Sequence, residues 1–108
     1  MTDSYILLLN ILKLCYYNGC RDDLAPLLGE MDIDIFADGM PADLEVLDLW
    51  KNIYRDNDSN DVLKEKIIDL LNLLERMYTF DFSQTKIAIS NMSDNEINLI
   101  RKTGGRLP

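Results

Sequence analysis

Apolar residues recur along most of the chain with the spacing of helices. Between residues 4 and 18 they occupy nearly every face, which predicts a central helix enclosed by others. Gly19 follows and is expected to end this helix in the left-handed conformation. A short second helix is expected from Asp22 to Gly29, with the Asp22 carboxylate capping its first turn. Residues 30 to 40 alternate acidic and apolar side chains, so one helical turn and an irregular loop are both open there.

The middle of the chain predicts two longer helices joined by a polar linker. Pro41 falls in the first turn of a helix that runs to about Arg55, where proline is tolerated. The apolar residues of this helix lie on one stripe: Val46, Leu47, Trp50, Ile53 and Tyr54. The linker over 55–61 is rich in turn and capping residues. A helix with regular apolar spacing is expected after it, from about Asn60 to Tyr78.

The C-terminal part is irregular before it ends in a well-marked helix. Residues 79–91 show no clear helical period, and a short extended segment is one alternative for residues 85–90. Ser93 and Glu96 have the spacing of a capping box, so the last helix is expected to begin there and to run to Lys102. The whole pattern predicts an all-α fold: a compact bundle of four to five helices in a single domain over 1–108.

Composition places this domain among soluble cytoplasmic proteins. Small secreted domains tend to be rich in disulfides, whereas this chain of 108 residues has two cysteines, Cys15 and Cys20. A disulfide between them is geometrically allowed but not favoured. The apolar run over 5–17 is shorter than the roughly 20 residues of a membrane span. It also contains Asn10 and Lys13, and we therefore expect no membrane segment.

The sequence offers little that catalysis or metal binding would need. It has no histidine, no phosphate-binding glycine loop and no nucleophile motif. Asp56, Asp58 and Asn60 match the first ligand positions of a calcium loop. Asp61 stands where that loop requires glycine, and Ile67 where it requires a bidentate glutamate. We expect no enzymatic activity, no metal site and no cofactor.

Charge is distributed very unevenly along the chain. The formal net charge is −8, and residues 22–61 hold twelve acidic residues against Lys51 and Arg55, a local balance of −10. The segments on either side carry +1 each. A solvated acidic face and a surface for a cationic partner are both open explanations. Direct binding of nucleic acid is disfavoured, because phosphate needs a basic patch.

The acidic segment and the helix that leaves it contain the candidate contact residues. Acidic side chains would meet lysine and arginine of a partner, and aromatic side chains would serve as anchors, because these contribute much of the binding energy at interfaces. Core packing is the alternative for Trp50, whose stripe also contains core-type residues. The candidates are Asp32, Asp34, Asp38, Asp43, Glu45, Asp48, Trp50 and Tyr54.

In size, acidity, helical content and lack of catalytic residues, the chain resembles the helical immunity proteins of bacterial contact-dependent growth-inhibition systems. The likeness is one of overall type and transfers no site residue. It implies a cytoplasmic protein that binds a toxin domain, often a cationic nuclease, and blocks its active site or the approach of its substrate. A helical adaptor or self-associating structural protein, and a phage-type mimic of nucleic acid, are the alternative functions.

Overall fold

The computed structural model describes residues 3–32, 40–41, 44–55 and 58–102. The all-α class is confirmed, because these residues contain helices and no strand. The expected number of four to five helices is wrong, since the described residues form six. They are α1 (Asp3–Tyr17), α2 (Leu24–Met31), α3 (Glu45–Ile53), α4 (Asn60–Met77), α5 (Ser83–Ser90) and α6 (Asp94–Lys102).

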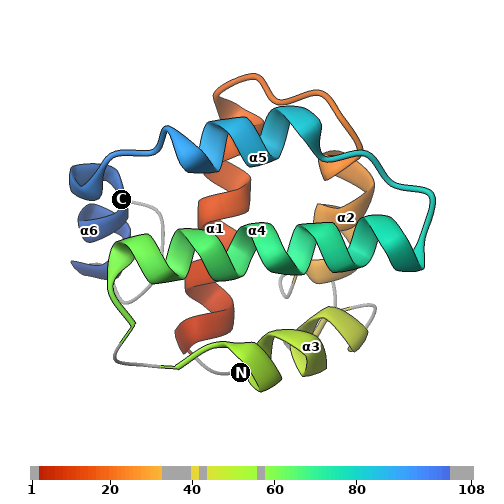
Figure 1. Ribbon diagram of the computed structural model, residues 1–108, viewed down its shortest axis with the longest axis horizontal. Helices are drawn as coiled ribbons and strands as arrows, with labels where there is room; N and C mark the ends of the chain where they lie inside the picture. Colours follow the sequence, from red (N-terminus) through yellow and green to blue (C-terminus); the bar gives the residue numbers. More distant parts are fainter. Residues whose placement is uncertain (1–2, 33–39, 42–43, 56–57, 103–108) are drawn as a thin grey trace.

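Helix α1 runs through the middle of the molecule and contacts α2, α3, α5 and α6 (Figure 1). Its side chains are buried on nearly every face, as the apolar pattern predicts. Even the Tyr5 hydroxyl is buried, and it donates to the Met31 carbonyl at 2.7 Å. The predicted central helix is therefore confirmed.

Helix α1 ends in a Schellman motif. The Cys20 N–H donates to the Cys15 carbonyl and the Gly19 N–H to the Tyr16 carbonyl, both at 3.1 Å. Gly19 has a φ of 109°, the left-handed conformation expected of it. Both cysteines are free and buried at this turn, and burial raises the pKa of Cys15 to about 12. The thiols therefore stay protonated and pack as small apolar groups.

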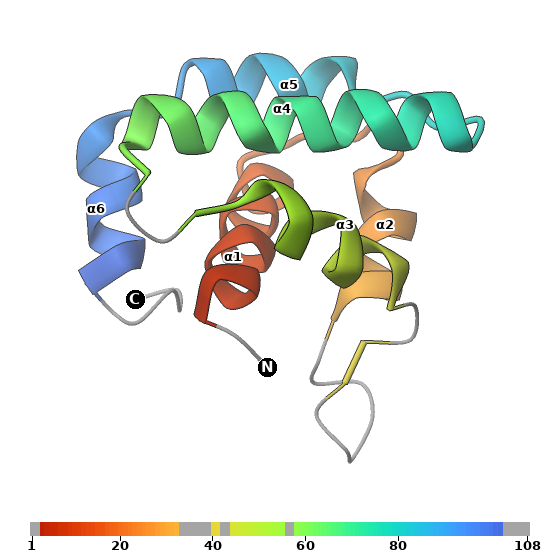
Figure 2. The same cartoon turned by 60° about the horizontal axis from the view of Figure 1, so that its bottom comes forward.

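Helices α4 and α5 lie side by side across α1 and form one layer (Figure 2). The apolar stripe of α4 faces the core, with Leu63, Ile67, Leu70, Leu71 and Leu74 buried. Helix α3 packs on α1 and α4, while α6 packs against α1 near the end of the layer where α4 begins. The buried residues form one hydrophobic cluster that includes side chains from all six described helices.

The extended segment considered for residues 85–90 is wrong, because these residues belong to α5. The Lys86 N–H donates to the Phe82 carbonyl at 2.8 Å, which is a helical bond. The alternation of Ile87 and Ile89 resembles a strand, yet only Ile89 is buried. Packing of α5 on α1 and α4 therefore overrides a weak local preference.

The predicted start of α6 is confirmed, and two other predicted helix ends are shifted. In α6 the Glu96 N–H donates to Ser93 Oγ at 3.2 Å and the Ser93 N–H to Glu96 Oε1 at 3.2 Å, which completes the capping box. Helix α2 extends past Gly29 to Met31, so the expected stop at glycine is wrong. The helix expected from Pro41 is observed from Glu45, after two residues outside the described part.

Candidate protein-interaction surface

The predicted contact residues fall into three groups. Asp34, Asp38 and Asp43 lie outside the described residues. Trp50 and Tyr54 are 0% and 8% exposed. The remaining three acidic residues, Asp32, Glu45 and Asp48, are at least partly accessible on α3 or just after α2.

Trp50 and Tyr54 belong to the core. Their rings stack with centroids 5.0 Å apart, and Trp50 Nε1 donates to the Ser4 carbonyl at 3.1 Å. This bond joins α3 to the first turn of α1. Core packing, the alternative raised for Trp50, is therefore the arrangement in the structure, and we leave both rings out of the contact surface.

The accessible acids differ in how they are held. Asp32 forms an ion pair with Lys13 at 3.5 Å. Glu45 accepts a hydrogen bond from the Tyr78 hydroxyl at the end of α4. Asp48 is exposed one turn further along α3. Among the predicted contact residues that the structure describes, Glu45 and Asp48 are therefore the accessible acids that lie on a helix.

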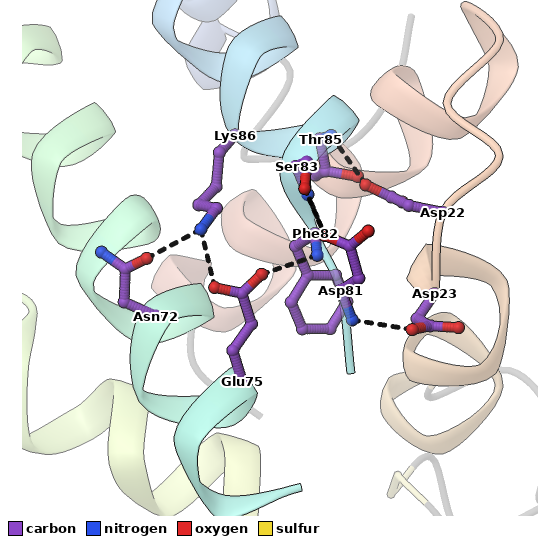
Figure 3. Close-up of polar contacts among 9 residues, drawn as sticks. All are labelled: Asp22, Asp23, Asn72, Glu75, Asp81, Phe82, Ser83, Thr85 and Lys86. Carbon is purple, nitrogen blue, oxygen red and sulfur yellow. Dashed lines mark hydrogen bonds and ion pairs between the residues drawn. The ribbon is translucent and has the colours of Figure 1, made fainter. Parts of the chain in front are cut away.

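Two acids of the segment 22–61, Asp22 and Asp23, are used inside the fold, together with two acids outside that segment, Glu75 and Asp81. Asp22 Oδ2 accepts from the Thr85 N–H and Asp22 Oδ1 from the Thr85 hydroxyl, both at 2.9 Å (Figure 3). Asp23 accepts from the Asp81 N–H at 2.7 Å. Glu75 accepts from the Phe82 N–H at 2.8 Å and from Lys86 Nζ at 2.6 Å. We call Asp22, Asp23, Glu75 and Asp81, which surround the start of α5, the carboxylate clasp.

The carboxylate clasp explains why α5 begins where it does. Phe82, at the N-cap position of α5, has no side-chain oxygen to offer. The first N–H groups of a helix need acceptors, and here Asp22 accepts from the Thr85 N–H. Glu75 and Asp23 accept from the N–H groups of Phe82 and Asp81, which come just before the helix. Asp81 accepts from the Ser83 N–H at 2.9 Å, which adds a local cap. Much of the clasp charge is therefore structural and not free for a partner.

The carboxylate clasp should make the fold less stable as the pH falls. Hydrogen bonds from Lys86 and from the Phe82 N–H hold the pKa of Glu75 below its ordinary value, and those from Ser83 do the same for the pKa of Asp81. Carboxyls with a lowered folded pKa stabilise the fold above their unfolded pKa and lose this contribution as pH falls through the folded one. In urea titrations we expect the free energy of unfolding to decrease once the pH is lowered past about 4.5.

The Glu75→Gln variant should lose part of this pH dependence, because it removes one titrating group. Glu65→Gln on the exposed side of α4 is the matched control and should keep the wild-type profile. A Glu75→Gln profile as steep as that of the wild type would show that Glu75 does not contribute to the pH dependence of stability.

The linker that resembles a calcium loop is also held internally. Lys66 Nζ lies 2.5 Å from Asp58 Oδ2, and this hydrogen bond lowers the pKa of Asp58. The Asn60 side chain donates to Asn98 at 2.9 Å and accepts from Arg101 Nε at 2.9 Å, which joins α4 to α6. The described linker residues thus form hydrogen bonds that join helices to one another.

The structure adds three accessible apolar residues at the start of α3 and the end of α4. Leu44, Met77 and Tyr78 are 49%, 43% and 40% exposed, and the Tyr78–Glu45 hydrogen bond places the end of α4 beside the start of α3. We call these three residues the anchor patch. The apolar period of α4 continues from Leu74 to Met77 and Tyr78, but the sequence does not show where the core stops. Exposure is therefore the feature that sequence reasoning missed.

Two further findings concern metal binding and membrane insertion. In the described part of the chain, no group of acidic or cysteine side chains is placed to hold a metal ion. None of the helices there has the length and apolar character to cross a membrane. Comparison with protein families, with curated proteins and with solved structures finds no match to this chain.

Proposed function

We propose that this chain is an immunity-type protein that binds a cationic toxin domain, in the simplest case a nuclease, and keeps it from its substrate. The observation that carries the proposal is the balance of −10 over residues 22–61. Lysine and arginine side chains that bind nucleic acid phosphate would meet carboxylates instead.

We place the proposed contact on α3. Asp22 and Asp23 serve the clasp, and Asp58 pairs with Lys66. Asp48 is exposed and takes part in none of the ion pairs among the described residues. Asp48 and Glu45, on a helix packed against α1 and α4, therefore present negative charge in a fixed position. Fixed charges steer encounter and set register more than they add affinity.

The test uses the product of the neighbouring gene, the first partner to examine. We expect this product to arrest growth when expressed alone and to be harmless when co-expressed with the chain. The purified pair should form a 1:1 complex whose association rate falls as ionic strength rises. The Glu45→Lys/Asp48→Lys variant should associate about tenfold more slowly and with weaker salt dependence.

A matched control separates position from net charge. Glu65 and Asp69 are exposed on α4, so Glu65→Lys/Asp69→Lys changes the net charge by the same amount elsewhere on the surface. This control should associate within about threefold of the wild type, because rim charges outside the contact act only at long range. An association rate that responds equally to both variants would contradict the assignment to α3. Growth arrest that the chain does not relieve would contradict the proposed function.

A further inference from the structure

We infer that the anchor patch of Leu44, Met77 and Tyr78 is a docking site for an apolar side chain that the partner flanks with lysine or arginine. The inference rests on the proposed function and specifies the chemistry of the partner at the same surface. It assigns the binding energy to apolar contact and the orientation to charge.

The first observation is that the apolar stripe of α4 extends beyond the buried core. Leu70 and Leu74 are 1% and 0% exposed, whereas Met77 and Tyr78, in the next turn, are 43% and 40% exposed. The same helix face is thus buried over most of its length and open at its end. Adjacent exposed apolar side chains of this kind mark contact sites more often than isolated ones do.

The second observation concerns Leu44, which occupies the N-cap position of α3. Leucine is among the poorest residues there, and its side chain accepts no hydrogen bond from the helix. The side chain is also 49% exposed, so it contributes little to the core. By contrast Phe82, the apolar residue at the N-cap of α5, is completely buried. Leu44 therefore serves neither the helix end nor the interior, which is the pattern expected at functional positions.

The third observation is that Tyr78 is held in place. Its hydroxyl donates to Glu45, and its ring lies 5.7 Å from that of Phe80, which lies 5.5 Å from the buried Phe82. A row of rings thus connects the surface to the core. A fixed aromatic side chain loses little conformational entropy on binding, which makes it an effective anchor.

The charges around the patch specify the partner. Glu45 accepts a hydrogen bond from Tyr78, and Asp48 lies about one turn after Leu44, with its N–H donating to the Leu44 carbonyl. Arg76, although adjacent in sequence to Met77, lines a hollow with Asp69, Asn72 and Glu75 on another side of α4. Lys51 is exposed nearly two turns beyond Leu44. Negative charge next to apolar surface therefore favours a segment that combines an apolar side chain with basic neighbours.

The probes are two synthetic helical peptides of equal length and equal lysine content. One has a leucine stripe, and the other has serine in place of each leucine. We expect calorimetry to show that the leucine peptide binds at least tenfold more tightly. Amide chemical shifts should change most at residues 44–48 and 77–80. Equal affinity for the two peptides would overturn the inference.

The decisive variant is Leu44→Ser, because serine suits a helix N-cap and the fold should remain intact. Its Tm should stay within about 3 °C of the wild type, while its affinity for the leucine peptide falls about tenfold. Tyr78→Ala should weaken binding similarly. The matched control is Ile87→Ser, since Ile87 is 64% exposed on α5, away from the patch. Weakening by Ile87→Ser equal to that by Leu44→Ser would overturn the inference.

Further outcomes separate this inference from the proposed function. If Glu45→Lys/Asp48→Lys slows toxin association but Leu44→Ser and Tyr78→Ala leave toxin affinity unchanged, the inference fails and the function stands. If the leucine peptide binds as expected but no toxin is neutralised, the anchor stands and the function fails. Sedimentation that shows a dimer of this chain, converted to monomer by Leu44→Ser, would assign the patch to a second copy and overturn the inference.

Discussion

Replacing Trp50 with alanine should lower the free energy of unfolding by about 3–5 kcal/mol, the range for removing a large buried aromatic side chain. The indole is completely buried, and its loss would leave a cavity between α3 and its neighbours. The Ser4 carbonyl would lose this donor, and the Tyr54 ring would lose its stacking partner. Urea denaturation followed by circular dichroism measures the change.

Tyr17→Ala is the control for Trp50→Ala. Tyr17 is also aromatic, but it is 66% exposed, so its removal should change stability by no more than about 0.5 kcal/mol. Trp50→Phe should fall between the two, because it keeps a ring in the core and removes the indole N–H. A stable Trp50→Ala protein that is defective only in partner binding would restore Trp50 as a contact residue and contradict its assignment to the core.

Replacing Asp22 with alanine should cost about 2–4 kcal/mol, the second largest effect expected in this chain. Its carboxylate accepts from the N–H and the hydroxyl of Thr85, which is completely buried. Alanine would leave both Thr85 donors without this acceptor in a place where solvent access is poor. The first turn of α5 should loosen, so hydrogen exchange of the Thr85 and Lys86 amides should accelerate along with the loss of stability.

Asp23→Ala provides the comparison for Asp22→Ala. Asp23, like Asp22, precedes α2 and has the same charge, but it accepts from an accessible N–H, that of Asp81. We expect a cost below about 1 kcal/mol, because water can replace the carboxylate there. Equal costs for Asp22→Ala and Asp23→Ala would show that burial of Thr85 does not determine the strength of the clasp.

The sequence predicted well those features that depend on local spacing. The burial of α1 on nearly all faces, the positive φ of Gly19 and the capping box of Ser93 and Glu96 each follow from a few consecutive residues. The boundaries of α4 were predicted to within one residue for the same reason. Where the local pattern was weak, as in α5, the prediction left two alternatives and the extended one was wrong.

The candidate surface was harder to predict, because exposure is a property of the assembled molecule. Tryptophan and tyrosine are common both at interfaces and in cores. Only the packing of α3 against α1 shows that Trp50 and Tyr54 belong to the core. Leu44 and Tyr78 lie 34 positions apart in the sequence, and no pattern indicates that the start of α3 and the end of α4 lie side by side. The acids of the 22–61 segment look equivalent in sequence, although some face α5 and others face solvent.

The sequence by itself determined that this chain is helical, that its first helix is the central one and that its negative charge is concentrated in the middle forty residues. Periodicity, helix caps and formal charge are written in neighbouring residues, so they do not depend on the fold. Only the tertiary structure decided which carboxylates are bound internally and which apolar side chains stay open. Asp22 and Thr85 are 63 positions apart, and such partners meet only after the helices have packed.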